Sequence, residues 1–193
     1  MNLLSPRAYS RLMQLFYDRR LRDRIARLLN PQTGQRLLDV ACGSGDLFAV
    51  THPCRYIGTD VDFGRVRHAA HNRMTLVVSN ARALPFLDHS FDRILASGLF
   101  HHVNDETAVA VLAEMARIIK PNGRVVVLDA IWPRRWYNLT GLLARRLDDG
   151  KFVRHPRDYE LFFSKAFAVH NLEYPSRLTL DYVLAVLESP GDA

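Results

Sequence analysis

Short, mostly apolar runs alternate with helical segments from residue 37 to residue 128, and this alternation constrains the fold more than any other feature of the chain. Each run has the length of a β-strand; the five runs are residues 37–41, 55–59, 75–78, 92–96 and 124–128. Buried strands separated by helices form parallel sheets that helices cover on both faces. The pattern therefore predicts an α/β fold with a doubly wound, Rossmann-like sheet.

Helical periodicity predicts three helices around these runs, over residues 6–29, 63–71 and 105–119. In the third helix, apolar residues recur at steps of three or four and share one face. The turn at residues 120–123 contains a proline and a glycine, so it would end that helix.

The pattern changes beyond Asp129. The segment 132–163 is rich in aromatic residues and arginine, and its pattern predicts two helices. Two strands are predicted after it, at residues 166–173 and 179–187. The short turn between them suits an antiparallel pair. We expect a single domain with a mostly parallel seven-stranded sheet that ends in this pair. Its parts would be an N-terminal cap helix in 1–34, a cofactor-binding core in 35–130, a lid insertion in 131–165 and the terminal strand pair in 166–188.

Composition narrows the class of protein. No apolar run approaches the roughly 20 residues of a membrane-spanning helix, and the start lacks a signal peptide, so a cytoplasmic location is expected. The two cysteines and the histidines lack metal-ligand spacing, so no metal site is expected. The net charge of +6 leaves nucleic acid or an anionic membrane open as a partner, although the arginines are scattered along the chain.

The turn after the first strand is the most informative segment, and we expect a helix to follow it, with its N-terminal amides facing the same space. Gly43 and Gly45 lack a Cβ atom, so the backbone there can approach a ligand closely. A dinucleotide fingerprint needs a third small residue where Phe48 stands, which disfavours a pyrophosphate ligand. Asp60 ends the second strand, where a carboxylate can accept both hydroxyls of a ribose; alternatively it only caps the next helix. The combination favours a nucleoside ligand.

These segments resemble class I S-adenosylmethionine-dependent methyltransferases, and among them the ubiquinone/menaquinone C-methyltransferase-like (methyltransferase type 11) branch. Residues 38–47 resemble the family's first motif, and residues 83–92 its adenine-side loop. Residues 99–103 resemble its histidine-bearing segment, and residues 113–123 the helix and turn before strand five. The likeness covers about residues 35–130 and implies S-adenosylmethionine as the cofactor.

The resemblance also implies roles for the glycine turn and the strand ends. Asp39 would orient the turn or contact the methionine amino group, helped by the Ala41 carbonyl. Gly43 and Gly45 would line the methionine moiety, and Asp60 would hold the ribose.

Four further residues complete the expected cofactor-binding set: Asn80 and Ala81, which would face the adenine edge, Val61 and Ser97. The family usually has aspartate where Asn80 stands. An amide oxygen can still accept a hydrogen bond, so we expect binding to survive, weaker by about 1 kcal/mol.

Methyl transfer to a phenol or a ring carbon requires a base, and histidine is suited to that role near neutral pH. His101 and His102 follow the fourth strand, on the edge where open α/β sheets bind ligands. Neighbouring side chains rarely point the same way, so we expect at most one catalytic histidine, His101 or His102, and prefer His102. The alternative is a buried histidine bonded to backbone, or a surface one.

The segment 132–163 is a candidate substrate lid, because long insertions at this edge often select the substrate. Its candidate residues are Trp136, Tyr137, Phe152, Arg154, His155, Tyr159 and Phe162. Alternatively, these aromatic rings pack the insertion onto the domain. Tyr9 or Tyr17 of the N-terminal helix could form the opposite wall.

The preferred function is methylation, on oxygen or carbon, of a small-molecule or lipid-like acceptor. An RNA methyltransferase is disfavoured, because residues 97–100 lack the Asn/Asp-Pro-Pro-Tyr/Phe segment that acts on base amino groups. A non-catalytic, cofactor-binding partner protein stays open. So does peripheral membrane contact through the basic, amphipathic N-terminal helix, which is compatible with the preferred function. The oligomeric state is not readable from the sequence.

Overall fold

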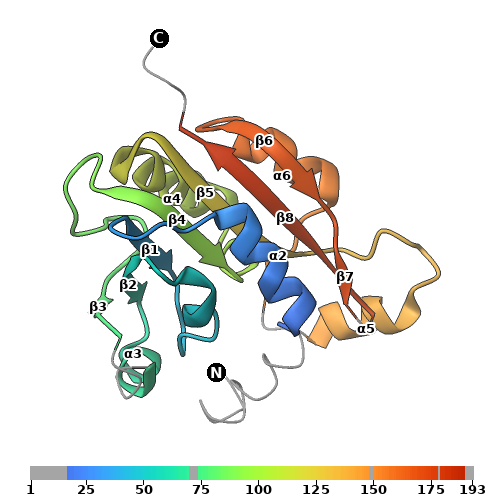
Figure 1. Cartoon of the computed structure of the whole chain (residues 1–193). Helices are drawn as coiled ribbons and strands as arrows, with labels where there is room; N and C mark the ends of the chain where they lie inside the picture. Colours follow the sequence, from blue (N-terminus) through green and yellow to red (C-terminus); the bar gives the residue numbers. More distant parts are fainter. Residues whose placement is uncertain (1–16, 70–73, 148–149, 178, 190–193) are drawn as a thin grey trace.

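A computed structural model describes residues 17–69, 74–147, 150–177 and 179–189 of the chain. Its centre is one mixed β-sheet with the strand order β3-β2-β1-β4-β5-β8-β6, and β7 also pairs with β8 (Figure 1). The strands are β1 (Arg36–Val40), β2 (Arg55–Asp60), β3 (Leu76–Val78), β4 (Phe91–Ser97), β5 (Ile119–Ile131), β6 (Ala168–Glu173), β7 (Ser176–Arg177) and β8 (Leu180–Glu188).

The first five strands run parallel, as the sequence predicts, and β8 runs antiparallel to both β5 and β6. The predicted Rossmann-like fold with an antiparallel terminal pair is therefore confirmed. Within the described residues, the two-residue strand β7 lies inside the turn expected between the last two strands and pairs with β8, in addition to the seven strands of the main order.

Helices cover both faces of the sheet (Figure 1). The helices are α2 (Arg19–Leu29), α3 (Phe63–Ala69), α4 (Asp105–Ile118), α5 (Leu139–Leu147) and α6 (Pro156–Phe163), with short 3₁₀ helices η1 (Phe48–Thr51) and η3 (Phe100–His102). Successive strand residues alternate between the faces. Leu38 accordingly belongs to the core formed with α4 and α6, and Leu37 to the core formed with α2 and η1.

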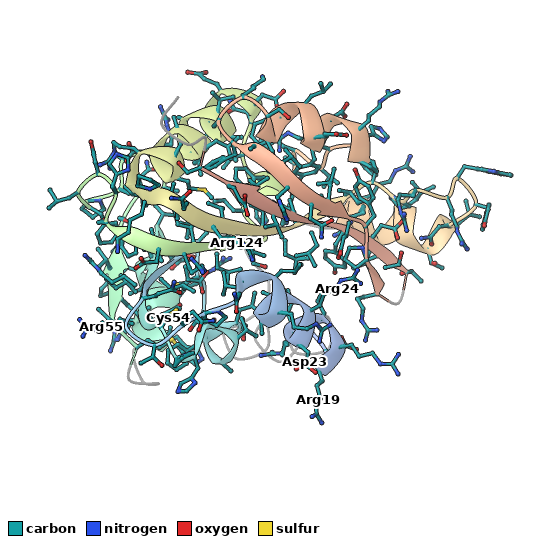
Figure 2. All side chains as sticks on the ribbon, turned by 45° about the horizontal axis from the view of Figure 1, so that its top comes forward. Arg19, Asp23, Arg24, Cys54, Arg55 and Arg124 are labelled. Carbon is teal, nitrogen blue, oxygen red and sulfur yellow. The ribbon has the colours of Figure 1, made fainter. Side chains whose placement is uncertain are left out.

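The N-terminal helix begins later than the sequence suggests. Asp18 has an extended backbone and accepts a hydrogen bond from the Leu21 N–H at 3.0 Å, so it caps a helix that starts at Arg19. A single helix through residues 6–29 is therefore wrong at residue 18; residues 6–16 lie outside the described part. The apolar residues of α2 are buried, whereas Arg19 points away from the sheet (Figure 2).

Two other expectations need correction. Only the four-residue η1 follows the glycine turn, where a helix was expected. The predicted turn at residues 120–123 lies within β5, because Ile119 already pairs with Phe91 and the next pair joins Arg93 to Arg124. The chain accommodates these extra residues as an irregularity in which Asn122 has a φ of 61°.

The segment after β5 forms the two predicted helices, α5 and α6. Tyr159, Phe162 and Phe163 of α6 are buried against the sheet. The second half of the expected lid is therefore part of the core, which is the packing alternative raised for it above. Among the described residues, no helix has the length and apolar character needed to cross a bilayer.

Candidate active site

A cavity of about 360 Å³ opens at the carboxyl ends of β1, β2 and β4. Open α/β sheets bind ligands at this edge, because the loops that follow the strands diverge there. Seven of the residues predicted to bind the cofactor or to act in catalysis line it: Asp39, Ala41, Gly43, Asp60, Val61, Ser97 and His102.

The loop after β1 bends back onto the end of β2. Ala41 and Gly43 have φ angles of 59° and 55°, a conformation that glycine adopts at little cost and alanine does not. The Gly43 N–H donates to Asp60 Oδ2 at 2.9 Å. No atom lies within 4 Å of the position that a Cβ on Gly43 would occupy, so the turn leaves open space beside the backbone.

Gly45 has a different place from the one expected. Its φ is 77°, but it is not among the residues that line the cavity. A Cβ there would lie 2.5 Å from the end of the Met74 side chain. The structure therefore gives Gly45 a place in the turn rather than at the cavity wall.

The carboxylate of Asp60 joins two backbone segments. Oδ2 accepts from Gly43, and Oδ1 accepts from the Asp62 N–H at 2.9 Å. The next helix is capped by Asp62, whose Oδ1 accepts from the N–H groups of Gly64 at 2.8 Å and Arg65 at 3.1 Å. The alternative that Asp60 only caps this helix is therefore wrong. Each Asp60 oxygen keeps capacity for a further hydrogen bond.

Asp39 lies at the back of the cavity and is almost fully buried. Burial raises the pKa of its carboxyl to about 7, and the neighbouring carboxylates of Asp60 and Asp46 act in the same direction. The Tyr56 hydroxyl donates to Asp39 Oδ2 at 3.0 Å and opposes part of this rise. Asp46 and Asp60 also line the cavity, so three carboxyl groups surround one space, with Arg65 beside them.

His101 and His102 form η3 directly after β4, and their surroundings differ. His102 is exposed and lines the cavity. His101 is buried, and its Nδ1 lies 2.5 Å from Asp129 Oδ1. The two rings lie beside each other, with centroids 4.0 Å apart and a tilt of 40°. The rings lie side by side, but of the two histidines only His102 lines the cavity.

Asp129 holds the histidine segment against β5. Its carboxylate also accepts from the backbone N–H groups of Phe100 at 2.5 Å and Ala130 at 2.6 Å. A carboxylate with these two donors favours the His101 tautomer that carries its proton on Nδ1. The His101 ring is thereby fixed in orientation.

The lid segment is hydrogen-bonded to the backbone of η3 and of the residue after it. The Phe152 N–H donates to the His101 carbonyl at 2.9 Å, and the Arg154 guanidinium donates to the carbonyls of Phe100 at 2.6 Å and Val103 at 3.0 Å. Within the described part of the chain, no aromatic residue of 132–163 lines the cavity. Tyr17 lines it instead, with its hydroxyl 2.9 Å from Ser97 Oγ. Tyr9 lies outside the described residues.

Asn80 and Ala81 follow β3 and do not line the cavity. Asn80 is exposed, and its side-chain oxygen accepts from the Arg82 N–H at 3.0 Å. The Ser79 N–H donates to the Asp60 carbonyl at 3.0 Å, which ties this loop to the end of β2. A role at the adenine edge stays a prediction for both residues.

The part of the chain that forms most of the cavity also matches a known protein family. Residues 38–127 match the model of a family described as a methyltransferase domain. This segment of the chain is a class I S-adenosylmethionine-dependent methyltransferase domain. The matched segment runs from Leu38 in β1 to Val127 in β5. It includes the glycine turn, Asp60 and both histidines.

Two curated methyltransferases illustrate the relationship. The demethylmenaquinone methyltransferase of Bacillus pumilus is 34% identical over 124 residues, which are 58% of this chain and 52% of that protein. The ubiquinone/menaquinone biosynthesis C-methyltransferase of Geobacter sulfurreducens is 33% identical over 138 residues, which are 65% of this chain and 53% of that protein. The chain thus spans about half the length of these curated relatives.

Solved methyltransferase structures share the fold. A chain of the Haloferax volcanii complex that contains the Trm112 methyltransferase activator superposes with a TM-score of 0.77 at 18% identity, covering 97% of this chain and 96% of that chain. The geranyl diphosphate C-methyltransferase of Streptomyces coelicolor, solved with S-adenosyl-L-homocysteine, has a TM-score of 0.72 at 15% identity, covering 87% and 74%. At these identities the likeness concerns the fold alone.

Two partners of the site residues, Tyr56 and Asp129, were not predicted from the sequence. Tyr56 bonds to Asp39 because Gly58, the register partner of Asp39, has no Cβ to block the tyrosine hydroxyl. Asp129 is the one acidic residue in the buried and otherwise apolar stretch 125–131 of β5. A buried charge requires partners, so its position was a usable signal. The position of Arg65 at the cavity could not be predicted from its sequence neighbours, because α3 reaches the cavity only through the way the chain folds.

Proposed function

We propose that this protein transfers a methyl group from S-adenosylmethionine to oxygen or carbon of a small-molecule or lipid-like acceptor. The observation that carries the proposal is the single cavity onto which the glycine turn, Asp39, Asp60 and His102 all open. Family membership supports the reaction class.

The residues of the cavity suit the cofactor. S-adenosylmethionine, when bound, supplies a methyl group activated by a sulfonium sulfur, and it also carries an amino group and two ribose hydroxyls. Three carboxyl groups around the cavity favour a ligand with positive charge and hydroxyl donors. The open space beside Gly43 admits a ligand against the backbone. We assign Asp60 to the ribose and Asp39 to the amino group.

Asp39 would bind an amino group only as a carboxylate. Its raised pKa means that it holds a proton over part of the neutral range, so cofactor binding would release that proton. The Tyr56 hydroxyl, 3.0 Å from Oδ2, keeps the carboxyl oriented in both states.

We assign His102 as the base that removes a proton from the acceptor, because it is the histidine that lines the cavity. His101, fixed by Asp129, would position the neighbouring ring rather than touch the acceptor. The proton would pass to a ring nitrogen of His102, and the acceptor oxygen or carbon would then carry the electron pair that attacks the methyl group.

The acceptor class follows from the relatives only as a proposal. One curated relative is named for demethylmenaquinone, and one solved relative for geranyl diphosphate. Both names describe molecules with an isoprenoid part, so we propose a bulky hydrophobic acceptor for this chain.

Calorimetry tests the cofactor assignment. We expect S-adenosylhomocysteine and S-adenosylmethionine to bind with one site per chain, and NAD not to bind. Preference for NAD, or no binding of either adenosyl ligand, would refute the proposal. Steeply salt-dependent binding of RNA would favour the alternative of an RNA methyltransferase.

Transfer of a labelled methyl group to demethylmenaquinone or geranyl diphosphate tests the reaction. His102→Ala should keep its affinity for S-adenosylhomocysteine and lose turnover by about 10²–10⁴-fold, the usual contribution of a general base. His170→Ala is the matched control, since His170 is exposed on β6, away from the cavity. Full turnover in the His102→Ala variant would show that the base assignment is wrong.

A further inference from the structure

Helix α5 exposes two leucines and buries an arginine. Leu139 and Leu143, one turn apart on the same face, are 71% and 59% exposed, whereas Arg145 is only 4% exposed. A helix on a water-soluble domain normally buries its leucines and exposes its arginines. The exposed face of α5 therefore requires an explanation.

Specific contacts hold α5 in this orientation. Arg145 donates from Nε to the Ile131 carbonyl at 3.2 Å and from Nη2 to the Asp181 carbonyl at 2.7 Å, and its guanidinium lies 5.0 Å from the centre of the Tyr182 ring. Gly141 is buried against the backbone of Thr179, where no side chain would fit. The leucines face outward because the opposite face is fixed to the ends of β5 and β8.

The loop before α5 continues the exposed apolar surface. Trp136 is 84% exposed and Tyr137 is 58% exposed, with their rings in edge contact at 5.9 Å. The loop projects from the body of the domain (Figure 1), yet it is anchored at its base, where the Arg134 N–H donates to Asp181 Oδ2 at 2.8 Å. Trp136 and Tyr137 are therefore presented to solvent by an attached segment.

Arginines surround these apolar side chains. Arg134, Arg135 and Arg146 are exposed, and the sequence from Ile131 to Leu147 contains no acidic residue. We define the α5 surface as the exposed residues Arg134, Arg135, Trp136, Tyr137, Leu139, Leu143 and Arg146. Its composition is apolar and aromatic at the centre and positive around it.

We propose that the α5 surface docks onto an anionic lipid bilayer. Tryptophan and tyrosine favour the headgroup region, where their rings are partly buried and their polar atoms stay hydrated. The leucines of a short interfacial helix enter the boundary of the acyl chains, and arginines contact lipid phosphates. A projecting surface of one charge sign suits a bilayer better than it suits a groove on a protein.

The position of the α5 surface connects docking with the cavity. It follows β5, whose carboxyl end lies on the same edge of the parallel sheet as the ends of β1 and β4. A bilayer under α5 would thus lie on the acceptor side of the domain. This connection rests on the proposed lipid-like acceptor, whereas docking itself does not.

The α5 surface replaces the N-terminal helix as the docking element. In the described part of that helix, Leu21, Ile25 and Leu29 are buried in the core. Helix α2 therefore offers a membrane its arginines and no apolar face, so the expectation of membrane contact through its amphipathic face fails for residues 19–29.

Co-sedimentation of the full chain with vesicles tests the proposal. We expect binding to phosphatidylcholine vesicles that contain phosphatidylglycerol, and much weaker binding to pure phosphatidylcholine. Combining Trp136→Ser, Leu139→Gln and Leu143→Gln should weaken binding at least about tenfold. Substitution of Arg134, Arg135 and Arg146 by glutamine should weaken vesicle binding roughly fivefold for each arginine replaced. Leu87→Gln and Leu161→Gln, at residues 82% and 73% exposed elsewhere, are the matched controls.

Tryptophan fluorescence gives a second readout that needs no loss of binding. The chain has two tryptophans, so Trp132→Phe leaves Trp136 as the sole reporter. We expect its emission to shift to the blue when phosphatidylglycerol vesicles are added. Equal binding by wild type and the apolar variant, or no shift of the reporter, would overturn the proposal. So would a variant that changes self-association in the absence of lipid and leaves vesicle binding intact.

These measurements separate docking from catalysis. Vesicle binding is measured without cofactor or acceptor, and S-adenosylhomocysteine binding is measured without vesicles. A chain that binds S-adenosylhomocysteine but no vesicles refutes docking alone, and the reverse result refutes the methyltransferase proposal alone.

Discussion

Replacing Asp60 by asparagine removes one of two acceptors that join the glycine turn to the end of β2. In the native chain, Oδ2 accepts from the Gly43 N–H and Oδ1 from the Asp62 N–H, each at 2.9 Å. An asparagine has one carbonyl oxygen and one amide group. If the asparagine oxygen accepts from one of the two backbone N–H groups, its NH₂ group faces the other N–H group. Two donors then face each other and no hydrogen bond forms.

The cost follows from this geometry. A hydrogen bond to a charged acceptor contributes about 1.5–3 kcal/mol, and the Asp60 side chain is held in place by its nearly complete burial. We expect the free energy of unfolding to fall by about 2–3 kcal/mol. For a chain of this size each kcal/mol lowers Tm by about 2–4 °C, which gives a decrease of about 4–12 °C.

Asp62→Asn is the matched control. Asp62 accepts both of its backbone N–H donors through the single atom Oδ1, so an asparagine oxygen can replace it. Asparagine is also as good as aspartate at a helix N-cap. We expect Asp62→Asn to change Tm by less than about 2 °C, given that such a cap exchange costs a few tenths of a kcal/mol.

Thermal denaturation of both variants, followed by circular dichroism, measures the difference. Titration with S-adenosylhomocysteine measures whether loss of the Asp60 acceptor also weakens ligand binding, which we expect by at least about tenfold for a lost charged hydrogen bond. Equal Tm values for the two variants would refute the argument that Asp60 needs both oxygens. A normal affinity in a destabilised Asp60→Asn variant would refute its assignment to the ribose.

Three further predictions test separate contacts. Burial raises the Asp39 pKa from 3.8 to about 7, so between these pH values the native state keeps a proton that the unfolded chain has released. The free energy of unfolding should therefore fall as pH rises from about 4 to 7. Thermal melts from pH 4 to 8 should show this dependence in the wild type and not in the Asp39→Asn variant, and an equal dependence in both would contradict it. Gly58→Ala places a Cβ 2.7 Å from the Tyr56 hydroxyl and should cost about 1–3 kcal/mol in denaturant unfolding; an unchanged midpoint contradicts this. Arg154→Lys replaces the guanidinium group that donates to the carbonyls of Phe100 and Val103. It should lower Tm by about 4–8 °C, at about 1 kcal/mol per hydrogen bond. A decrease in Tm of less than about 1 °C would show that these two hydrogen bonds do not stabilise the fold.

The order of the elements could be predicted because local pattern carries it. Each apolar run of strand length became a strand, and the glycine turn with the strand-end aspartate indicated the edge that holds the cavity. The boundaries were less accurate. The turn at residues 120–123 is absorbed into β5 because Ile119 pairs with Phe91, a contact between residues 28 positions apart that no local window reveals.

The lid illustrates a different limit. Aromatic residues in an insertion can line a substrate site or pack against the core, and their sequence is similar in both cases. The structure buries Tyr159 and Phe162 in the core and leaves Trp136 in solvent. This division depends on how α5 and α6 meet the sheet, so the sequence alone left both alternatives open.

The amino-acid sequence by itself determined the parallel α/β core, the family and the place of the glycine turn, because periodicity, turn residues and motif spacing act over short stretches of chain. Only the tertiary structure decided which groups meet across strands. The Asp129–His101 contact and the Tyr56–Asp39 bond arise because β4 lies beside β5 and β1 beside β2 in a particular register. The outward face of α5 has the same origin, since Arg145 is buried by partners on β5 and β8 that lie far away in the sequence.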